Sequence, residues 1–164
     1  MKNKEGLMLS LFPNMRGFGY VCLEWPQRIV ERGVFSPRPK GNVKILRQVT
    51  KYVEFFKPMV IILRDCDTTS GSSMKQTKKL VTEITEYAKG VKVPVYRYSR
   101  EQVRDVFEQF GASTKYEIAN KIVTWFPELA RLAPPIRKPW KDEDYHMGVF
   151  DAMALIITHK YLTE

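Results

Sequence analysis

Apolar and polar positions along this chain follow two periods, and each period occupies its own stretch. Near the N-terminus, short apolar runs separated by turn residues predict antiparallel strands at 7–11, 18–25 and 28–34. From 43 to 56 the apolar residues recur at helical spacing, which predicts a helix. The run at 59–63 is short and apolar throughout, as expected of a strand that is buried on both faces.

The remainder of the chain alternates between helical and strand patterns. Ser99 is expected to cap a helix, because Gln102 stands three residues later and completes a capping box. The other expected elements are a helix at 74–88, a strand at 94–98, helices at 99–110 and 114–126, a proline-rich basic linker at 132–140, and a last helix that begins between 143 and 146 and ends near 161. This order predicts one α/β domain spanning 1–164. Its mixed five-strand sheet would have three antiparallel N-terminal strands followed by βαβα, with helices on both faces.

The composition fits a globular protein with a polyanionic partner. The chain has 164 residues, of which 44% are hydrophobic, and its formal net charge is +9. That charge favours nucleic acid as the partner, with an acidic membrane surface as second choice and an ordinary basic enzyme surface as the alternative. No apolar run is long enough to span a membrane and no secretory signal is present, so we expect a cytoplasmic protein without a membrane partner. Cys22 and Cys66 form no CxxC motif, which argues against a structural zinc site.

One carboxylate, Asp151, lies in an otherwise apolar stretch near the C-terminus. Charged side chains are seldom buried without a partner. An Asp at the start of such a helix caps it, binds a metal, or points into a cleft. Asp151 is therefore the first candidate for a functional residue.

Four stretches of the chain resemble the RuvC-type Holliday-junction resolvases, which have the RNase H-like fold. They are 11–20, with its Phe-Pro-Asn-Met-Arg turn and Gly-Tyr pair, 58–65, 95–115 and 151–159, and they occur in the family's order. The resemblance covers nearly the whole chain. It implies a role in DNA recombination, Mg²⁺ or Mn²⁺ as the cofactor of an active nuclease, and a homodimer.

In that family three or four acids bind two metal ions: one acid in the middle of the first strand, one at the end of the fourth, and two on the last helix, three residues apart. The first position matches Phe12 here, which cannot bind a metal. The fourth-strand position falls on Arg64 or, with a shift of one residue, on Asp65. On the last helix Asp151 matches, but Gly148 stands three residues before it. The set of acids is thus incomplete.

A rebuilt acidic site is one hypothesis. Asp144 stands seven residues before Asp151, on the same helix face if the helix reaches back that far. With Asp65, and with Asp67 nearby, these would be the catalytic acids of an active enzyme, and Asp151 and Asp65 would bind Mg²⁺ or Mn²⁺. Two alternatives stay open: Asp144 suits a helix N-terminus, and Asp151 suits an internal ion pair with Arg64. An inactive protein would need no cofactor.

Basic residues complete the resemblance. Arg104 and Lys115 match two positions that face DNA phosphates in the family, and Lys121, Arg137 and Lys138 add positive charge. Such side chains would bind the nucleic-acid backbone in a salt-dependent manner, without reading bases. For each of them alone, a solvated surface is the better interpretation.

Three functions follow, in order of preference. The first is a resolvase-like protein that binds branched or duplex DNA, with catalysis lost or reduced. The second is an active endonuclease that cleaves phosphodiester bonds with Mg²⁺ or Mn²⁺ at a rebuilt acidic site. The third is a non-catalytic interaction scaffold. The loop at 65–73 carries no aromatic residue, whereas the family inserts one into the junction centre from this loop.

Overall fold

The computed structural model describes residues 6–66, 74–136, 138, 140 and 143–164. Its strands are β1 (Leu7–Pro13), β2 (Phe18–Glu24), β3 (Arg28–Phe35), β4 (Val60–Arg64) and β5 (Val95–Tyr98). They form one mixed sheet in the order β3-β2-β1-β4-β5. The first three strands pair antiparallel, whereas β4 runs parallel to both β1 and β5. The fold class and the sheet predicted from the sequence are confirmed.

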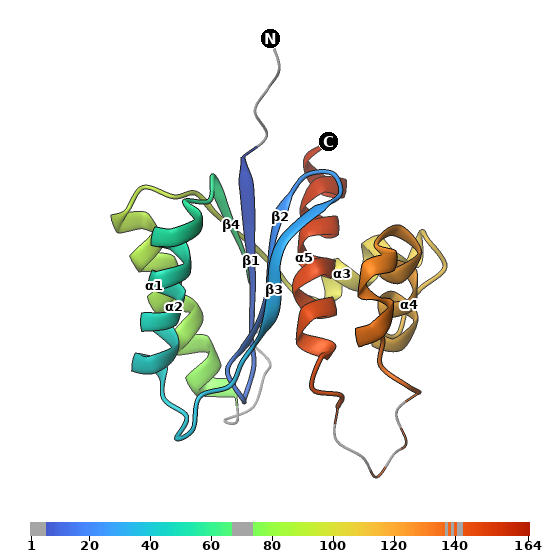
Figure 1. Ribbon diagram of the computed structural model, residues 1–164, viewed down its shortest axis with the longest axis horizontal. Coiled ribbons are helices and arrows are strands. Elements are labelled where there is room, and N and C mark those ends of the chain that lie inside the picture. Colours follow the sequence, from blue (N-terminus) through green and yellow to red (C-terminus); the bar gives the residue numbers. More distant parts are fainter. Residues whose placement is uncertain (1–5, 67–73, 137, 139, 141–142) are drawn as a thin grey trace.

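Helices cover both faces of this sheet (Figure 1). They are α1 (Asn42–Phe56), α2 (Lys75–Gly90), α3 (Arg100–Glu108), α4 (Lys115–Trp125) and α5 (Met147–Thr163), with a 3₁₀ helix, η2, at Pro127–Leu132. One core lies between the sheet and the α1–α2 pair. The other lies between the sheet and α5 and continues to α3 and α4, which pack on the far side of α5. Within the described residues, the structure has no helix that is both long and apolar enough to cross a membrane.

The central strands are buried on both faces, as the apolar run of β4 predicted. Leu9 and Leu11 of β1 belong to the core beneath α1 and α2, whereas Met8 belongs to the core beneath α5. Ser10 is fully buried, and its hydroxyl donates a hydrogen bond of 2.6 Å to the Ala152 carbonyl oxygen. This bond satisfies a buried polar group and ties β1 to α5.

Helix α5 approaches β2 so closely that two glycines meet. A Cβ atom on Gly19 would lie 2.1 Å from the Gly148 carbonyl oxygen, and one on Gly148 would lie 3.1 Å from the Gly19 Cα. A separation of 2.1 Å is too short for a carbon and an oxygen atom that are not bonded. The helix therefore keeps its place because position 19 has no side chain.

The last helix begins later than the sequence predicted. Its first residue is Met147, rather than one between 143 and 146. Asp144 precedes it in a turn, where its Oδ1 accepts a hydrogen bond of 2.9 Å from the His146 N–H. The expectation that Asp144 and Asp151 share one helical face is therefore wrong.

Two capping boxes set the first residues of α3 and α4. Ser99 and Gln102 form the predicted one at α3. Thr114 and Glu117 form a second one at α4, which the prediction overlooked. Strand β1 runs two residues further than predicted and so includes Phe12. These details place α3, α4 and the end of β1 around one cleft.

Candidate functional site

A cleft opens where β1 and β4 end and α5 begins. The two strands are parallel, and the carboxyl ends of parallel strands are a common place for a site in an α/β fold. The cavity has a volume of about 240 Å³. Its charged lining consists of Arg16, Arg64, Arg100, Lys115, Glu143, Asp144 and Asp151. Cations and carboxylates thus share one small space.

The positions that correspond to the resolvase acids do converge here. Phe12, Arg64, Gly148 and Asp151 all line this cleft. The four positions named by the resemblance therefore lie together, but of these residues only Asp151 carries a carboxylate. Gly148 packs against β2 as described above, so a larger side chain there would crowd the strand.

The Arg64 side chain is fixed at the end of β4. Its guanidinium carbon lies 4.6 Å from the centroid of the Phe12 ring, a cation–π distance. One guanidinium N–H donates a hydrogen bond of 2.8 Å to the Pro13 carbonyl oxygen. Burial lowers the pKa of Arg64, and the nearby Asp151 carboxylate opposes this. Since arginine starts from so high a pKa, the group stays positively charged.

Asp151 has a cation partner, but it is not the expected one. Its Oδ2 lies 3.5 Å from the Lys115 Nζ, and its side chain is 11% exposed. Lys115 also donates hydrogen bonds of 3.1 and 3.0 Å to the two carboxylate oxygens of Glu143. The alternative of an internal ion pair at Asp151 is thus realised with Lys115, while Arg64 acts on it from further away.

Burial dominates the acidity of Asp151. It raises the pKa of this carboxyl to about 6, because the charged form loses hydration. The Lys115 ammonium opposes the shift, the Glu143 carboxylate adds to it, and Arg64 opposes it more weakly. An acid with such a pKa in the lining of a cleft is typical of a functional site.

The other acids predicted for the site are scattered. Asp65 points toward Arg97, with its Oδ1 3.9 Å from the Arg97 Nε, and it is absent from the described lining of the cleft. Asp144 does line the cleft. Asp67 belongs to 67–73, outside the described residues. Glu143 was missed, because its charge was interpreted as part of a helix N-terminus.

The donor set does not suit a pair of catalytic metal ions. Within the described residues, the structure has no group of three or more His, Cys, Asp or Glu side chains close enough to hold a metal. Lys115 lies between the two carboxylates that come nearest to forming one, and a phenyl ring stands at Phe12. Mg²⁺ prefers several carboxylate and water oxygens, which this arrangement does not offer.

Basic side chains continue from this cleft into an adjoining cavity of about 470 Å³ between α3, α4 and α5. Arg104 and Lys115, the two candidates for contact with DNA phosphates, line it together with Arg100. Arg100 and Arg16 were missed by sequence reasoning. Arg100 had a signal: it follows β5, whose carboxyl end lies at the same edge as those of β1 and β4.

The remaining basic candidates lie elsewhere. The Lys121 Nζ is 5.6 Å from the centroid of the Trp125 ring, and the Lys138 Nζ is 5.6 Å from that of Trp140. Neither is part of the described lining of the two cavities above. Arg137 lies outside the described residues.

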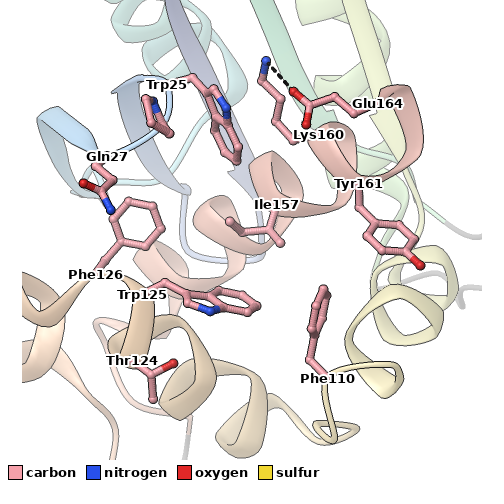
Figure 2. A pocket seen from close by; sticks show the side chains of 11 residues that line it. Trp25, Gln27, Phe110, Thr124, Trp125, Phe126, Ile157, Lys160, Tyr161 and Glu164 are labelled. Atoms are coloured by element: carbon pink, nitrogen blue, oxygen red, sulfur yellow. Dashed lines mark ion pairs between the residues drawn. The ribbon is translucent and has the colours of Figure 1, made fainter.

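A third cavity, of about 940 Å³, lies at the other end of α5. Figure 2 shows aromatic side chains from several elements around Ile157, among them Trp25, Phe110 and Trp125. None of the described candidates for the site lines it. The described candidates that line a cavity, namely Asp144, Asp151, Arg104 and Lys115, all do so at the charged end of α5.

Comparison with known proteins gives no relative by sequence: no protein-family model matches the chain, and no curated protein matches it. Solved structures do match. RuvC from T. thermophilus, in complex with a Holliday junction substrate, is 16% identical over 96% of this chain and 94% of its own, with a TM-score of 0.71. The yeast mitochondrial Holliday junction resolvase is 11% identical over 94% of this chain and 77% of its own, with a TM-score of 0.63.

A viral protein extends the same group. The Fowlpox virus resolvase, in complex with Holliday junction DNA, is 15% identical over 96% of this chain and 99% of its own, with a TM-score of 0.51. At these identities the likeness concerns the fold. The chain therefore has the RNase H-like fold of the RuvC-type resolvases, over nearly its whole length.

Proposed function

We propose that this protein is a resolvase-like binder of branched or duplex DNA whose nuclease activity is lost or much reduced. The observation that carries the proposal is the cleft itself. The resemblance assigns the resolvase acids to positions that line this cleft, and two of these positions hold a phenyl ring, at Phe12, and a guanidinium, at Arg64.

The loss of catalysis follows from what hydrolysis of a phosphodiester needs. Resolvases of this type use two divalent ions to activate water and to stabilise the leaving oxygen, which takes several converging carboxylates. In this cleft Asp151 is neutralised by Lys115, and Arg64 brings a second positive charge. Those charges disfavour a divalent cation, because like charges repel strongly where water is scarce.

The same charges favour DNA binding. Arg16 and Arg100 line the cleft and Arg104 lines the adjoining cavity, so guanidinium groups face a continuous surface. Guanidinium groups bind phosphates with paired hydrogen bonds. Two of the solved neighbours were captured with Holliday junction DNA, which supports a branched substrate for this chain as well.

The test is a labelled four-way junction incubated with the protein in Mg²⁺, in Mn²⁺ and in EDTA, with the Asp151→Asn variant beside it. We expect salt-sensitive binding in all three conditions and no metal-dependent cleavage. Cleavage by the parental protein that disappears in Asp151→Asn would contradict the loss of catalysis. Absence of binding to both the junction and a duplex would leave the interaction scaffold as the function.

One observation favours the active endonuclease as a second candidate. Glu143, Asp144 and Asp151 line the same cleft, so three carboxylates are available within one cavity. Lys115 would have to leave its two partners before they could converge on a metal. The cleavage experiment above distinguishes the two candidates directly.

A further inference from the structure

Lys115 is placed as a metal ion would be. Its Nζ contacts both oxygens of Glu143 at 3.1 and 3.0 Å and one oxygen of Asp151 at 3.5 Å. The three oxygens belong to Glu143, before α5, and to Asp151, within α5. These residues are 28 and 36 positions away from Lys115 along the chain. A single positive centre thus joins α4, the turn before α5, and the first turns of α5.

The chain holds this ammonium group in place. Lys115 is the first residue of α4, directly after the Thr114 cap, and its side chain is 28% exposed. The Nζ also lies 5.8 Å from the centroid of the Phe12 ring. The ammonium therefore has an aromatic ring as well as two carboxylates as neighbours.

The charges close to Lys115 are balanced without any added ion. Two carboxylates, Glu143 and Asp151, face two cations, Lys115 and Arg64, and the guanidinium of Arg64 is itself fixed on Phe12. A divalent ion added beside Lys115 would leave two positive charges in excess. Water is scarce around Asp151, so such an excess is costly.

We propose that Lys115 is a built-in replacement for a divalent cation. It holds Glu143 and Asp151 together as a metal would, and it keeps Mg²⁺ and Mn²⁺ out of the cleft. This inference rests on the proposed function and deepens it. It explains how a cleft that binds DNA would keep its shape without a metal ion.

The direct test is the Lys115→Met variant, which removes the ammonium and keeps most of the side-chain volume. In this variant Glu143 and Asp151 face the position that the ammonium group has left. Asp144 lies in the same cavity, and water can supply the other ligands of a metal ion. We expect 5 mM Mn²⁺, a probe concentration, to raise the Tm of this variant by roughly 3–8 °C and that of the parental protein by less than about 1 °C. Loss of the free Mn²⁺ signal in electron paramagnetic resonance would count the bound ions.

Three further variants make the result specific. Lys121→Met is the matched control, because it removes a lysine from the same helix whose Nζ lies over Trp125 instead. Lys115→Arg keeps a cation and should behave as the parental protein. Lys115→Met combined with Asp151→Asn should lose the Mn²⁺ response. Folding of each variant is checked by circular dichroism without metal.

Two outcomes would overturn the proposal. One is a folded Lys115→Met variant that binds no Mn²⁺ at millimolar concentration, and the other is a parental protein that binds Mn²⁺ as well as the variant does. If Lys115→Met does not fold, Lys115→Gln takes its place under the same criteria. Since the readout involves no DNA, a failure of junction binding and a failure of this inference are seen separately.

Discussion

At the scale of single residues, Asp151 contributes to stability in a pH-dependent way. Burial raises its pKa from 3.8 to about 6, so the folded protein holds a proton between these values that the unfolded chain releases. The carboxylate therefore costs no stability below about pH 4, and its cost grows as pH rises to about 6. A shift of about two units corresponds to about 3 kcal/mol.

The Asp151→Asn variant should reveal this cost. We expect its free energy of unfolding to exceed that of the parental protein above pH 6, with a difference that shrinks toward zero near pH 4. Urea unfolding of both proteins at several pH values between 4 and 7 measures the difference. A difference that is constant across this range would show that Asp151 does not titrate as its burial requires.

Sequence reasoning found the site through single residues, and it failed through single residues. It reached Phe12 and Arg64 by matching them to the acid positions of the resolvases, and Asp151 by its charge in an apolar stretch as well. It failed at Asp65, one residue after Arg64, because neighbouring residues along an extended chain point in opposite directions. The pairing of Lys115 with Glu143 was out of reach, since it joins residues 28 apart through the docking of an irregular segment.

At the scale of elements, the close approach of α5 to β2 depends on a glycine. It brings the Gly148 carbonyl oxygen to within 2.1 Å of where a Cβ on Gly19 would lie. Gly19→Ala must therefore push the helix away from the sheet. Overpacking of this kind costs about 1–3 kcal/mol, and a backbone neighbour cannot rotate aside.

We expect Gly19→Ala to lower the free energy of unfolding by at least about 2 kcal/mol, as measured by urea denaturation. Gly90→Ala is the matched control. Gly90 ends α2, and a Cβ there would meet no atom within 4 Å. That variant should be neutral or slightly more stable, because alanine favours a helix. Equal effects of the two substitutions would contradict the close approach of α5.

Strands and helices could be predicted where a local sequence pattern alone determines them. Period-two runs, helical spacing and the Ser99–Gln102 capping box identified the strands and helices outside η2. The start of α5 was misplaced because Asp144 is compatible with a helix N-terminus, and the choice depends on how the preceding segment docks. The capping box at Thr114 and Glu117 was overlooked although its local signal was present.

At the scale of the whole molecule, a group of basic side chains lies at the end of the sheet where β1 and β4 stop. The net charge of +9 predicts contact with a polyanion, but it does not tell which surface of the protein makes the contact. The structure places Arg16, Arg100 and Arg104 around the two adjoining cavities beside Asp151. Binding through such groups should follow the release of counterions, with a slope of about 0.9 per neutralised phosphate in a plot of log K against log salt.

The distribution of this charge can be tested with one pair of reversals. Arg104→Glu should weaken binding to a four-way junction by at least about tenfold and reduce the salt slope by about 1, because it removes a phosphate contact and adds repulsion. Lys51→Glu makes the same change of net charge at an exposed position of α1, which lies across the sheet from α5. It should alter the affinity by no more than about threefold, the share of net charge alone. Fluorescence anisotropy from 50 to 300 mM salt measures both quantities. Equal losses in the two variants would mean that the protein binds DNA by its overall charge, and that the cleft beside Asp151 is not the place of contact.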